Sequence, residues 1–187
     1  DHNMSIKLPI SDTLVEFETG DKIFAEIIRN GTSTPECKVI DCFGEAESKE
    51  ANYQAILAES EIPIDFTPEE LAEAERLAST PISPDGRVVR DEIILTIDGE
   101  GAKDLDDAIS LRRLPKGGWR LGVHIADVSH YVRERTPLDR CVMQRGTSVY
   151  FTDKVVPMLP PALSHGACSL NSGEDTYTIS ALISLDA

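Results

Sequence analysis

The sequence predicts an α+β protein with a β-rich beginning and a mixed remainder. Runs rich in β-branched and aromatic residues, separated by turn residues, occupy residues 1–45 and indicate strands. A helix-start signal and two helix-like runs fall within residues 46–90. Strand-like and helix-like runs are mixed beyond that point. We therefore expect a β unit over 1–45, a helical connector over 46–90 and a mixed α/β domain over 91–187.

The β unit is predicted to hold three strands, at residues 13–17, 22–28 and 37–43. Gly20-Asp21 and Asn30-Gly31 supply the turns between them. A unit of this length is too short to close a barrel by itself.

Two helices are predicted in the connector, at residues 51–58 and 67–78. The second begins with Thr67 as its cap, Pro68 at the first helical position and Glu70 three residues after the cap. Seven acids and no base lie over residues 59–75, and we interpret them as a solvated helix face and its lead-in.

The mixed domain is predicted as strands at 93–97, 108–112, 119–128 and 176–185, a helix at 138–145 and an extended segment at 150–158. Gly117-Gly118 joins the second and third of these strands as a hairpin turn. The apolar run at 93–97 is typical of a buried strand.

The charge of the chain bears on its partner. The formal net charge is −15, which by itself disfavours nucleic acid because phosphates repel an acidic protein. However, residues 1–107 hold 26 acids and 9 bases, whereas residues 108–187 hold 7 acids and 9 bases. A phosphate-binding surface in the second part therefore stays open.

Composition also bears on the compartment. Hydrophobic residues make up 41% of the chain, enough for a folded core, and no apolar run has the length of a membrane span. The N-terminus lacks a basic segment followed by an apolar one, so no secretory signal is expected. The four cysteines form no CxxC pair, so we expect reduced thiols and no zinc ribbon. These features predict a cytoplasmic protein without membrane contact.

An aspartate-rich loop is the most informative segment. Four carboxylates follow the strand-like run that ends at Ile97: Asp98, Asp104, Asp106 and Asp107. Gly99 and Gly101 allow the intervening backbone to fold back, so that the four can converge. Carboxylates at close range repel one another unless a cation neutralises them. Oxygen ligands without His or Cys suit Mg²⁺ or Mn²⁺, which points to phosphoryl chemistry.

Two other interpretations of this loop compete with the metal site. An EF-hand is disfavoured because, counted from Asp104, the sixth position is Ile109 and the twelfth is Pro115. A solvated acidic turn is the structural alternative. The apolar neighbours Leu105 and Ala108 indicate a loop fixed against a core, which favours the metal site.

The same residues resemble the ribonuclease II/ribonuclease R family of exoribonucleases. The resemblance begins with Thr96-Ile97-Asp98 and the block from Lys103 to Ala108. It continues collinearly through residues 122–132, 145–151, 157–160, 163–164 and 168–171. Upstream, residues 20–44 resemble the end of the second cold-shock domain of that family. The resemblance implies a partial OB-like β unit followed by the N-terminal part of the RNB catalytic domain.

The resemblance also implies an activity. The family hydrolyses single-stranded RNA from the 3′ end to nucleoside 5′-monophosphates and needs Mg²⁺. By motif position, Asp98 and Asp107 would bind the metal and Asp104 would help to hold the ion or its waters. Asp106 would orient the 3′-terminal nucleotide or the attacking water, and Tyr150 would stack near the terminal base.

Three basic residues carry weaker predictions. Arg145 is a candidate phosphate contact in the substrate site. His124 and His130 stand among apolar residues, so we expect hydrogen-bonded core or edge residues rather than ligands.

The family's catalytic domain extends well beyond residue 187, so we expect this chain to be one part of the enzyme and weakly active or inactive alone. Exposed strand edges and apolar surface would then lead it to self-associate or be covered by partner chains. Two alternatives stay open: a non-catalytic RNA- or metal-binding module with the same fold, and a DNA-directed metal nuclease.

Overall fold

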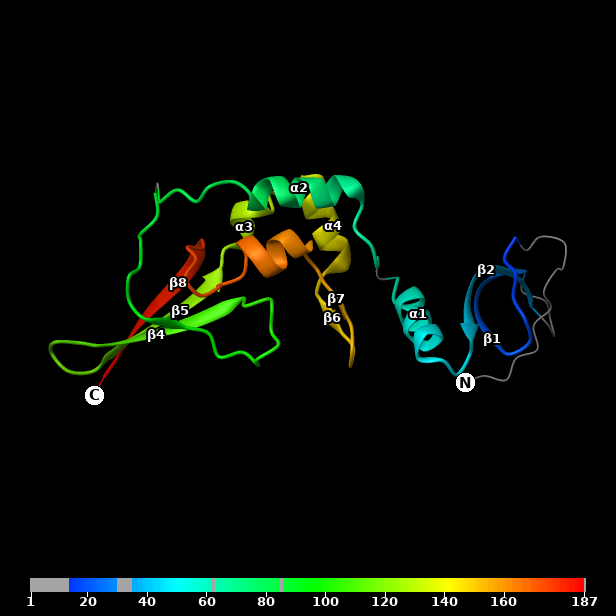
Figure 1. Ribbon diagram of the computed structural model, residues 1–187, viewed down its shortest axis with the longest axis horizontal. Helices are drawn as coiled ribbons and strands as arrows, with labels where there is room; N and C mark the ends of the chain where they lie inside the picture. The colour runs from blue at the N-terminus through cyan, green and yellow to red at the C-terminus, as the bar shows by residue number, and fades with distance from the viewer. Residues whose placement is uncertain (1–13, 30–34, 62, 85, 187) are drawn as a thin grey trace. The chain divides into compact units, whose positions relative to one another are not determined.

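The computed structural model describes residues 14–29, 35–61, 63–84 and 86–186. The chain divides into two compact units, Asp1–Ile64 and Asp65–Ala187. Both contain helices and antiparallel strands (Figure 1), so the predicted α+β class is confirmed. The boundary falls inside the expected connector, whose first helix belongs to the first unit and whose second helix belongs to the second.

The first unit is an antiparallel hairpin covered by one helix. Strand β1 (Asp21–Arg29) pairs with β2 (Glu36–Glu45), and helix α1 (Lys49–Glu59) packs against both. The Ser48 hydroxyl accepts a hydrogen bond from the Ala51 amide at 3.1 Å and caps the helix. The interior of the unit consists of Cys37, Val39, Ala51 and Leu57.

One predicted strand of this unit is wrong. Residues 14–17 form no strand and Leu14 is fully exposed, because none of the strands that the structure describes pairs with this segment. The two strands that do form correspond to the predictions at 22–28 and 37–43. The predicted turn at Asn30-Gly31 lies outside the described residues.

The second unit begins with helix α2 (Pro68–Ala78), whose predicted start is confirmed. The Glu70 amide donates to the Thr67 hydroxyl at 3.3 Å, and the Thr67 amide donates to the Glu70 carboxylate at 2.8 Å. This reciprocal pair satisfies two amides that would otherwise lack partners at the helix N-terminus.

A four-stranded antiparallel sheet follows in the order β3-β4-β5-β8. Its strands are β3 (Ile94–Leu95), β4 (Asp107–Arg113), β5 (Trp119–Ala126) and β8 (Thr178–Leu185). The predicted β4–β5 hairpin turns through Gly117 and Gly118, which have φ angles of 91° and 78°. The expectation of a buried strand at 93–97 is wrong: β3 is a short edge strand, and Ile93 and Ile97 beside it are exposed.

The remaining elements connect β5 to β8. They are α3 (Val128–Tyr131), α4 (Pro137–Arg145), β6 (Val149–Tyr150), β7 (Val155–Val156) and the π-helix η1 (Ala162–Ala167). The predicted extended segment at 150–158 is a tight β6–β7 hairpin. Neither α3 nor η1 was expected, because α3 is a single turn attached to a strand and η1 carries no side-chain cap.

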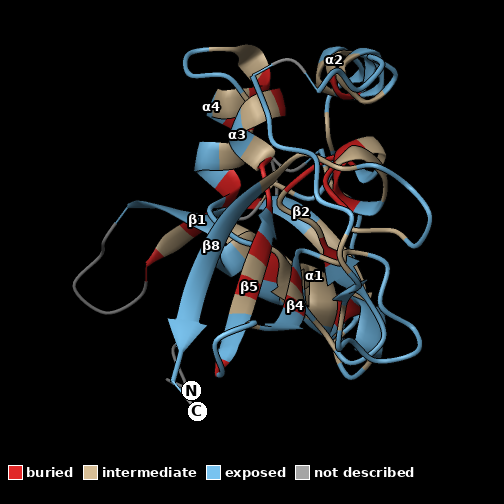
Figure 2. Ribbon diagram, turned by 90° about the vertical axis from the view of Figure 1, so that its left-hand side faces the viewer, coloured by how far each residue is buried: buried red, intermediate tan, exposed pale blue. Residues whose placement is uncertain are grey.

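The two faces of the sheet differ. Buried positions alternate along β4 and β5, as the red bands in Figure 2 show, and they comprise Ala108, Ser110, Gly122, His124 and Ala126. A cluster that includes Ala74 of α2, Leu138 of α4 and Leu163 of η1 forms the main core. The opposite face leaves Leu111, Ile125, Ile179 and Ile183 exposed. Among the helices that the structure describes, none is long and apolar enough to cross a membrane.

Candidate active site

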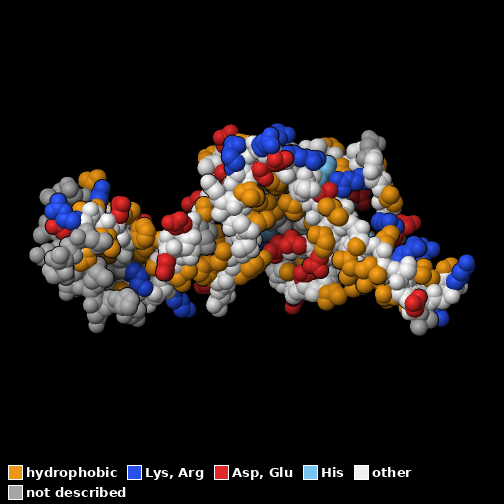
Figure 3. Space-filling view, turned by 180° about the vertical axis from the view of Figure 1, so that it is seen from behind, with side chains coloured by type: hydrophobic (Ala, Val, Ile, Leu, Met, Phe, Trp, Pro, Cys, Tyr) orange, Lys and Arg blue, Asp and Glu red, His pale blue; other side chains and the backbone are white. Residues whose placement is uncertain are grey.

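The aspartate loop connects β3 to β4 and is fixed at its end by the sheet. Asp107 is the first residue of β4 and lies opposite Ile125 of β5. The Asp106 carbonyl accepts a hydrogen bond from the Ala126 amide at 2.9 Å. The Ala102 amide donates to the Gly99 carbonyl at 3.0 Å, which folds the loop back between Asp98 and the later aspartates. The space-filling view shows acidic side chains gathered in a hollow over this segment (Figure 3).

The four carboxylates share one electrostatic environment. Burial raises the pKa of Asp106, and the negative charges of its three fellow aspartates raise it further: Asp104, Asp107 and Asp98. Within the described part of the chain, no arginine or lysine contributes to this shift. The loop therefore concentrates negative charge that a cation would neutralise.

The carboxylate oxygens of the loop are the ligands that a hard divalent cation prefers, but the side chains do not all point to one position. No three His, Cys, Asp or Glu side chains within the described ranges converge closely enough to hold an ion. Burial, together with the charges of Asp106 and Asp127, raises the pKa of the Cys168 thiol to about 12. The thiol stays protonated at neutral pH and is a poor ligand, so the available donors are carboxylate oxygens.

The structure brings Tyr150 to the aspartate loop. The Tyr150 hydroxyl donates a 2.6 Å hydrogen bond to Oδ2 of Asp104. This bond, followed by burial and the charges of Asp104 and Asp106, raises the pKa of Tyr150. The residue lies at the end of β6 and is 63% exposed, so its ring is available for stacking. Two motif blocks that are 46 residues apart in sequence thus meet at one place.

Arg145 lies elsewhere, at the buried C-terminal end of α4. Its two terminal nitrogens donate to the carbonyls of Pro157 (3.1 Å) and Asp65 (2.7 Å). Its guanidinium lies 3.8 Å from the centre of the Phe66 ring. With 5% of the residue exposed, these contacts fasten α4 to neighbouring segments, and they do not bring Arg145 to the aspartates. Its role as a phosphate contact stays a prediction.

Both histidines have structural contacts, as expected. His124 is buried and joins three strands: Nε2 lies 2.9 Å from the Ser110 hydroxyl and Nδ1 lies 2.8 Å from the Ser180 hydroxyl. Gly122 makes room for this hydrogen-bonded pair, because a Cβ there would lie 2.7 Å from Nε2 of His124 and 2.3 Å from the Ser110 hydroxyl oxygen. The His130 ring packs 4.0 Å from the Tyr177 ring, centre to centre.

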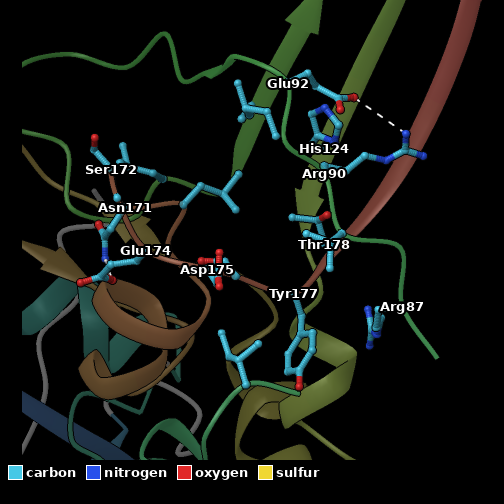
Figure 4. Close-up of a pocket in the computed structure, with 18 of the residues that line it drawn as sticks. Arg87, Arg90, Glu92, His124, Asn171, Ser172, Glu174, Asp175, Tyr177 and Thr178 are labelled. Carbon is cyan, nitrogen blue, oxygen red and sulfur yellow. Dashed lines mark hydrogen bonds and ion pairs between the residues drawn. The ribbon is translucent and has the colours of Figure 1, made fainter. Parts of the chain in front are cut away.

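A pocket of about 680 Å³ adjoins the loop on the covered side of the sheet. Thr96 and Leu105 line it, but none of the four aspartates does. Figure 4 shows Arg90 paired with Glu92 beside His124, with N and O atoms 3.9 Å apart. Arg87, the other arginine of the lining, is paired with Asp127. Because both arginines have acidic partners, the described residues that line the pocket include no unpaired arginine or lysine to bind a phosphate.

The comparisons with known proteins agree with this arrangement. Residues 87–187 match the RNB domain model and residues 1–67 match a cold shock domain model. The two matches together describe an RNB domain preceded by a cold shock domain. The chain belongs to the RNB domain family.

Within this family the chain is similar to ribonuclease R proteins. It is 43% identical to ribonuclease R of Thermotoga maritima over 172 residues, covering 88% of this chain and 24% of that protein. Mycoplasma genitalium RNase R, solved in complex with ribose methylated single-stranded RNA, matches with a TM-score of 0.85 and 26% identity over 98% of this chain and 29% of that one. The chain thus spans about a quarter of the length of these relatives.

A third match shows that a protein described as a pseudonuclease shares this fold. Yeast Ssd1, described as a pseudonuclease, gives a TM-score of 0.65 at 20% identity over 89% of this chain and 22% of that one. At that identity the likeness shows the fold alone. Whether such a fold hydrolyses RNA must therefore be argued from the site.

Proposed function

We propose that this chain is part of a Mg²⁺-dependent 3′-to-5′ exoribonuclease that hydrolyses single-stranded RNA to nucleoside 5′-monophosphates. The observation that supports it best is the uncompensated carboxylate loop, in which three aspartates raise the pKa of the fourth. The similarity to ribonuclease R supports the substrate class. The isolated chain is weakly active or inactive, because it spans about a quarter of those relatives.

Each loop residue has a distinct part in this proposal. Asp98 and Asp107 would hold the ion, and Asp104 would hold it or its waters. A bound Mg²⁺ would supply charge stabilisation to the phosphate and an activated water. Asp106, whose pKa is raised by burial and by the neighbouring aspartates, would orient the terminal nucleotide or the attacking water. Tyr150 would stack on the terminal base, a contact that tolerates any sequence.

Three further expectations belong to the same proposal. The partner is single-stranded RNA, and the compartment is the cytoplasm. The isolated chain self-associates through its sheet, because β8 is an edge strand and its residues Ile179 and Ile183 are exposed. Gel filtration with light scattering checks the last point, and a single monomeric species would contradict it.

The test of the activity uses the longer protein that contains this chain. It is incubated with 5′-labelled single-stranded RNA and Mg²⁺, beside the Asp106→Asn variant and a parallel reaction on single-stranded DNA. We expect a ladder of shortened RNA for the wild type, none for the variant and none with DNA. A wild type that binds RNA without shortening it would favour the non-catalytic module. Degradation of DNA would favour a DNA-directed nuclease.

A further inference from the structure

A buried serine, Ser169, is hydrogen-bonded to the backbone of the aspartate loop. Ser169 lies just after η1 and is 0% exposed. Its hydroxyl oxygen accepts a hydrogen bond from the Leu105 amide at 3.1 Å. The same oxygen lies 3.2 Å from both the Lys103 carbonyl and the Asn171 side-chain oxygen. Its single proton is shared between these two acceptors.

A main-chain bond strengthens the attachment. The Leu170 amide donates to the Leu105 carbonyl at 2.9 Å. The Lys103–Leu105 backbone is therefore bound to Ser169 and Leu170 at three points. These points flank Asp104 and directly precede Asp106, two of the four carboxylates that repel one another.

The segment that carries Ser169 is itself well fixed. The Ser169 amide donates to the Gly166 carbonyl at 2.8 Å, and its carbonyl accepts from the Thr176 hydroxyl at 3.3 Å. The Asn171 side chain donates to the His165 carbonyl at 3.3 Å. The π-helix η1 ends two residues before Ser169, and π-helices commonly adjust the backbone locally at functional sites.

We propose that Ser169 is a positioning residue for the metal site: its hydroxyl holds the Lys103–Leu105 backbone so that Asp104 and Asp106 face the same ion. The inference rests on the proposed function and names a residue that acts on the carboxylates through their backbone. A hydroxyl buried at this depth is costly unless it is hydrogen-bonded, and here the aspartate loop supplies two of its three contacts.

The test compares two serines of the same region in the longer protein. Ser169→Ala removes the contacts with the loop. Ser164→Ala is the matched control, because Ser164 is also buried and, among the described residues, its hydroxyl donates a hydrogen bond only to the Pro160 carbonyl, at 3.5 Å. Ser169→Cys keeps nearly the same volume and serves if the alanine variant fails to fold.

Three readouts are measured: hydrogen exchange of the Leu105 amide, Mn²⁺ affinity by electron paramagnetic resonance, and the Mg²⁺ concentration for half-maximal RNA degradation. For Ser169→Ala we expect faster exchange at Leu105, and a metal requirement raised roughly tenfold, as for other residues that orient metal ligands. Activity recovers at saturating Mg²⁺. Ser164→Ala changes none of the three.

The outcomes are distinct. Unchanged exchange and metal affinity in both Ser169 variants, or an equal change in Ser164→Ala, would overturn the positioning role. If the wild type degrades no RNA, the proposed function fails, yet exchange and Mn²⁺ affinity still decide whether Ser169 positions the carboxylates.

Discussion

Two carboxylates of the second unit, Asp106 and Asp127, lie in opposite electrostatic surroundings. Asp127 is buried, at 6% exposed, whereas Asp106 lies at the surface, but each carboxylate loses part of its solvation, which by itself raises the pKa of a carboxyl group. For Asp106 the neighbours are three more aspartates, so its pKa rises further. For Asp127, hydrogen bonds from Ser129 and Arg87 outweigh burial and lower its pKa.

The difference distinguishes a structural carboxylate from a functional one. Asp127 caps α3 and receives a 2.7 Å ion pair from Arg87, whose guanidinium also lies over the Tyr177 ring. The protein therefore supplies its counter-charge. Among the described residues, no arginine or lysine lowers the pKa of Asp106, so an external cation would supply its counter-charge.

The largest expected effect follows from removing the functional carboxylate. Asp106→Asn in the longer protein should lower the rate of RNA degradation roughly 10²–10⁴-fold, the range typical of a residue that orients the attacking group. Its melting temperature should not fall, because one charge leaves a repulsive cluster. Gel-based turnover assays and calorimetry measure the two quantities. A stable variant that retains full activity would contradict the role of Asp106.

The structural carboxylate should behave in the opposite way. Asp127→Asn leaves Arg87 without its charged partner and should cost about 2 kcal/mol of unfolding free energy. Activity per folded molecule should change little. Urea denaturation of the isolated chain measures the cost. Glu92→Gln is the control, because its 3.9 Å pair with Arg90 is partly exposed and worth well under 1 kcal/mol. Equal losses of unfolding free energy in the two variants would contradict the structural role of the Asp127–Arg87 ion pair.

The pH dependence of stability gives a finer contrast in metal-free buffer. Asp127 has a lowered pKa, so its contribution is present above the ordinary value of 3.8 and is lost as pH falls through the folded value. Asp106 has a raised pKa, so it costs stability increasingly as pH rises from 3.8 through the folded value. As pH rises from acid to neutral, the stability of Asp127→Asn should therefore decrease relative to that of the wild type. The stability of Asp106→Asn should increase relative to it. Parallel melting curves would contradict the assignment.

The charge repulsion within the aspartate loop was predictable from sequence because its residues are local. Four aspartates within ten positions, with glycines between them, have few ways to avoid one another. The approach of Tyr150 followed from the family resemblance, and its hydrogen bond to Asp104 needed the structure. Ser169 lies in the resembling block 168–171, but its role was missed because its partners Leu105 and Lys103 are 64 and 66 positions away in sequence.

The fold was predictable where a local signal determines it. The Thr67 capping box and the Gly117-Gly118 hairpin turn both form as predicted. No strand forms at residues 14–17, because alternation does not say whether a partner strand is present. The strand predicted at 93–97 forms only as β3, Ile94–Leu95, and its expected burial failed because an apolar run does not distinguish a central strand from an edge strand. Arg145 shows the same limit in a side chain: a basic residue in a functional motif block lies in the interior, on Phe66 and two backbone carbonyls.

The smallest expected effect concerns the hydroxyl of Tyr150. Its bond to Asp104 occupies an oxygen that a metal ion would use. Tyr150→Phe frees that oxygen and keeps the ring, so Mn²⁺ affinity should rise a few-fold while RNA binding stays close to that of the wild type. Tyr150→Leu is the control, since it removes the stacking surface as well and should weaken RNA binding by about 1–3 kcal/mol. Lower metal affinity in Tyr150→Phe would mean that the hydroxyl orients Asp104 toward the ion rather than competing with it.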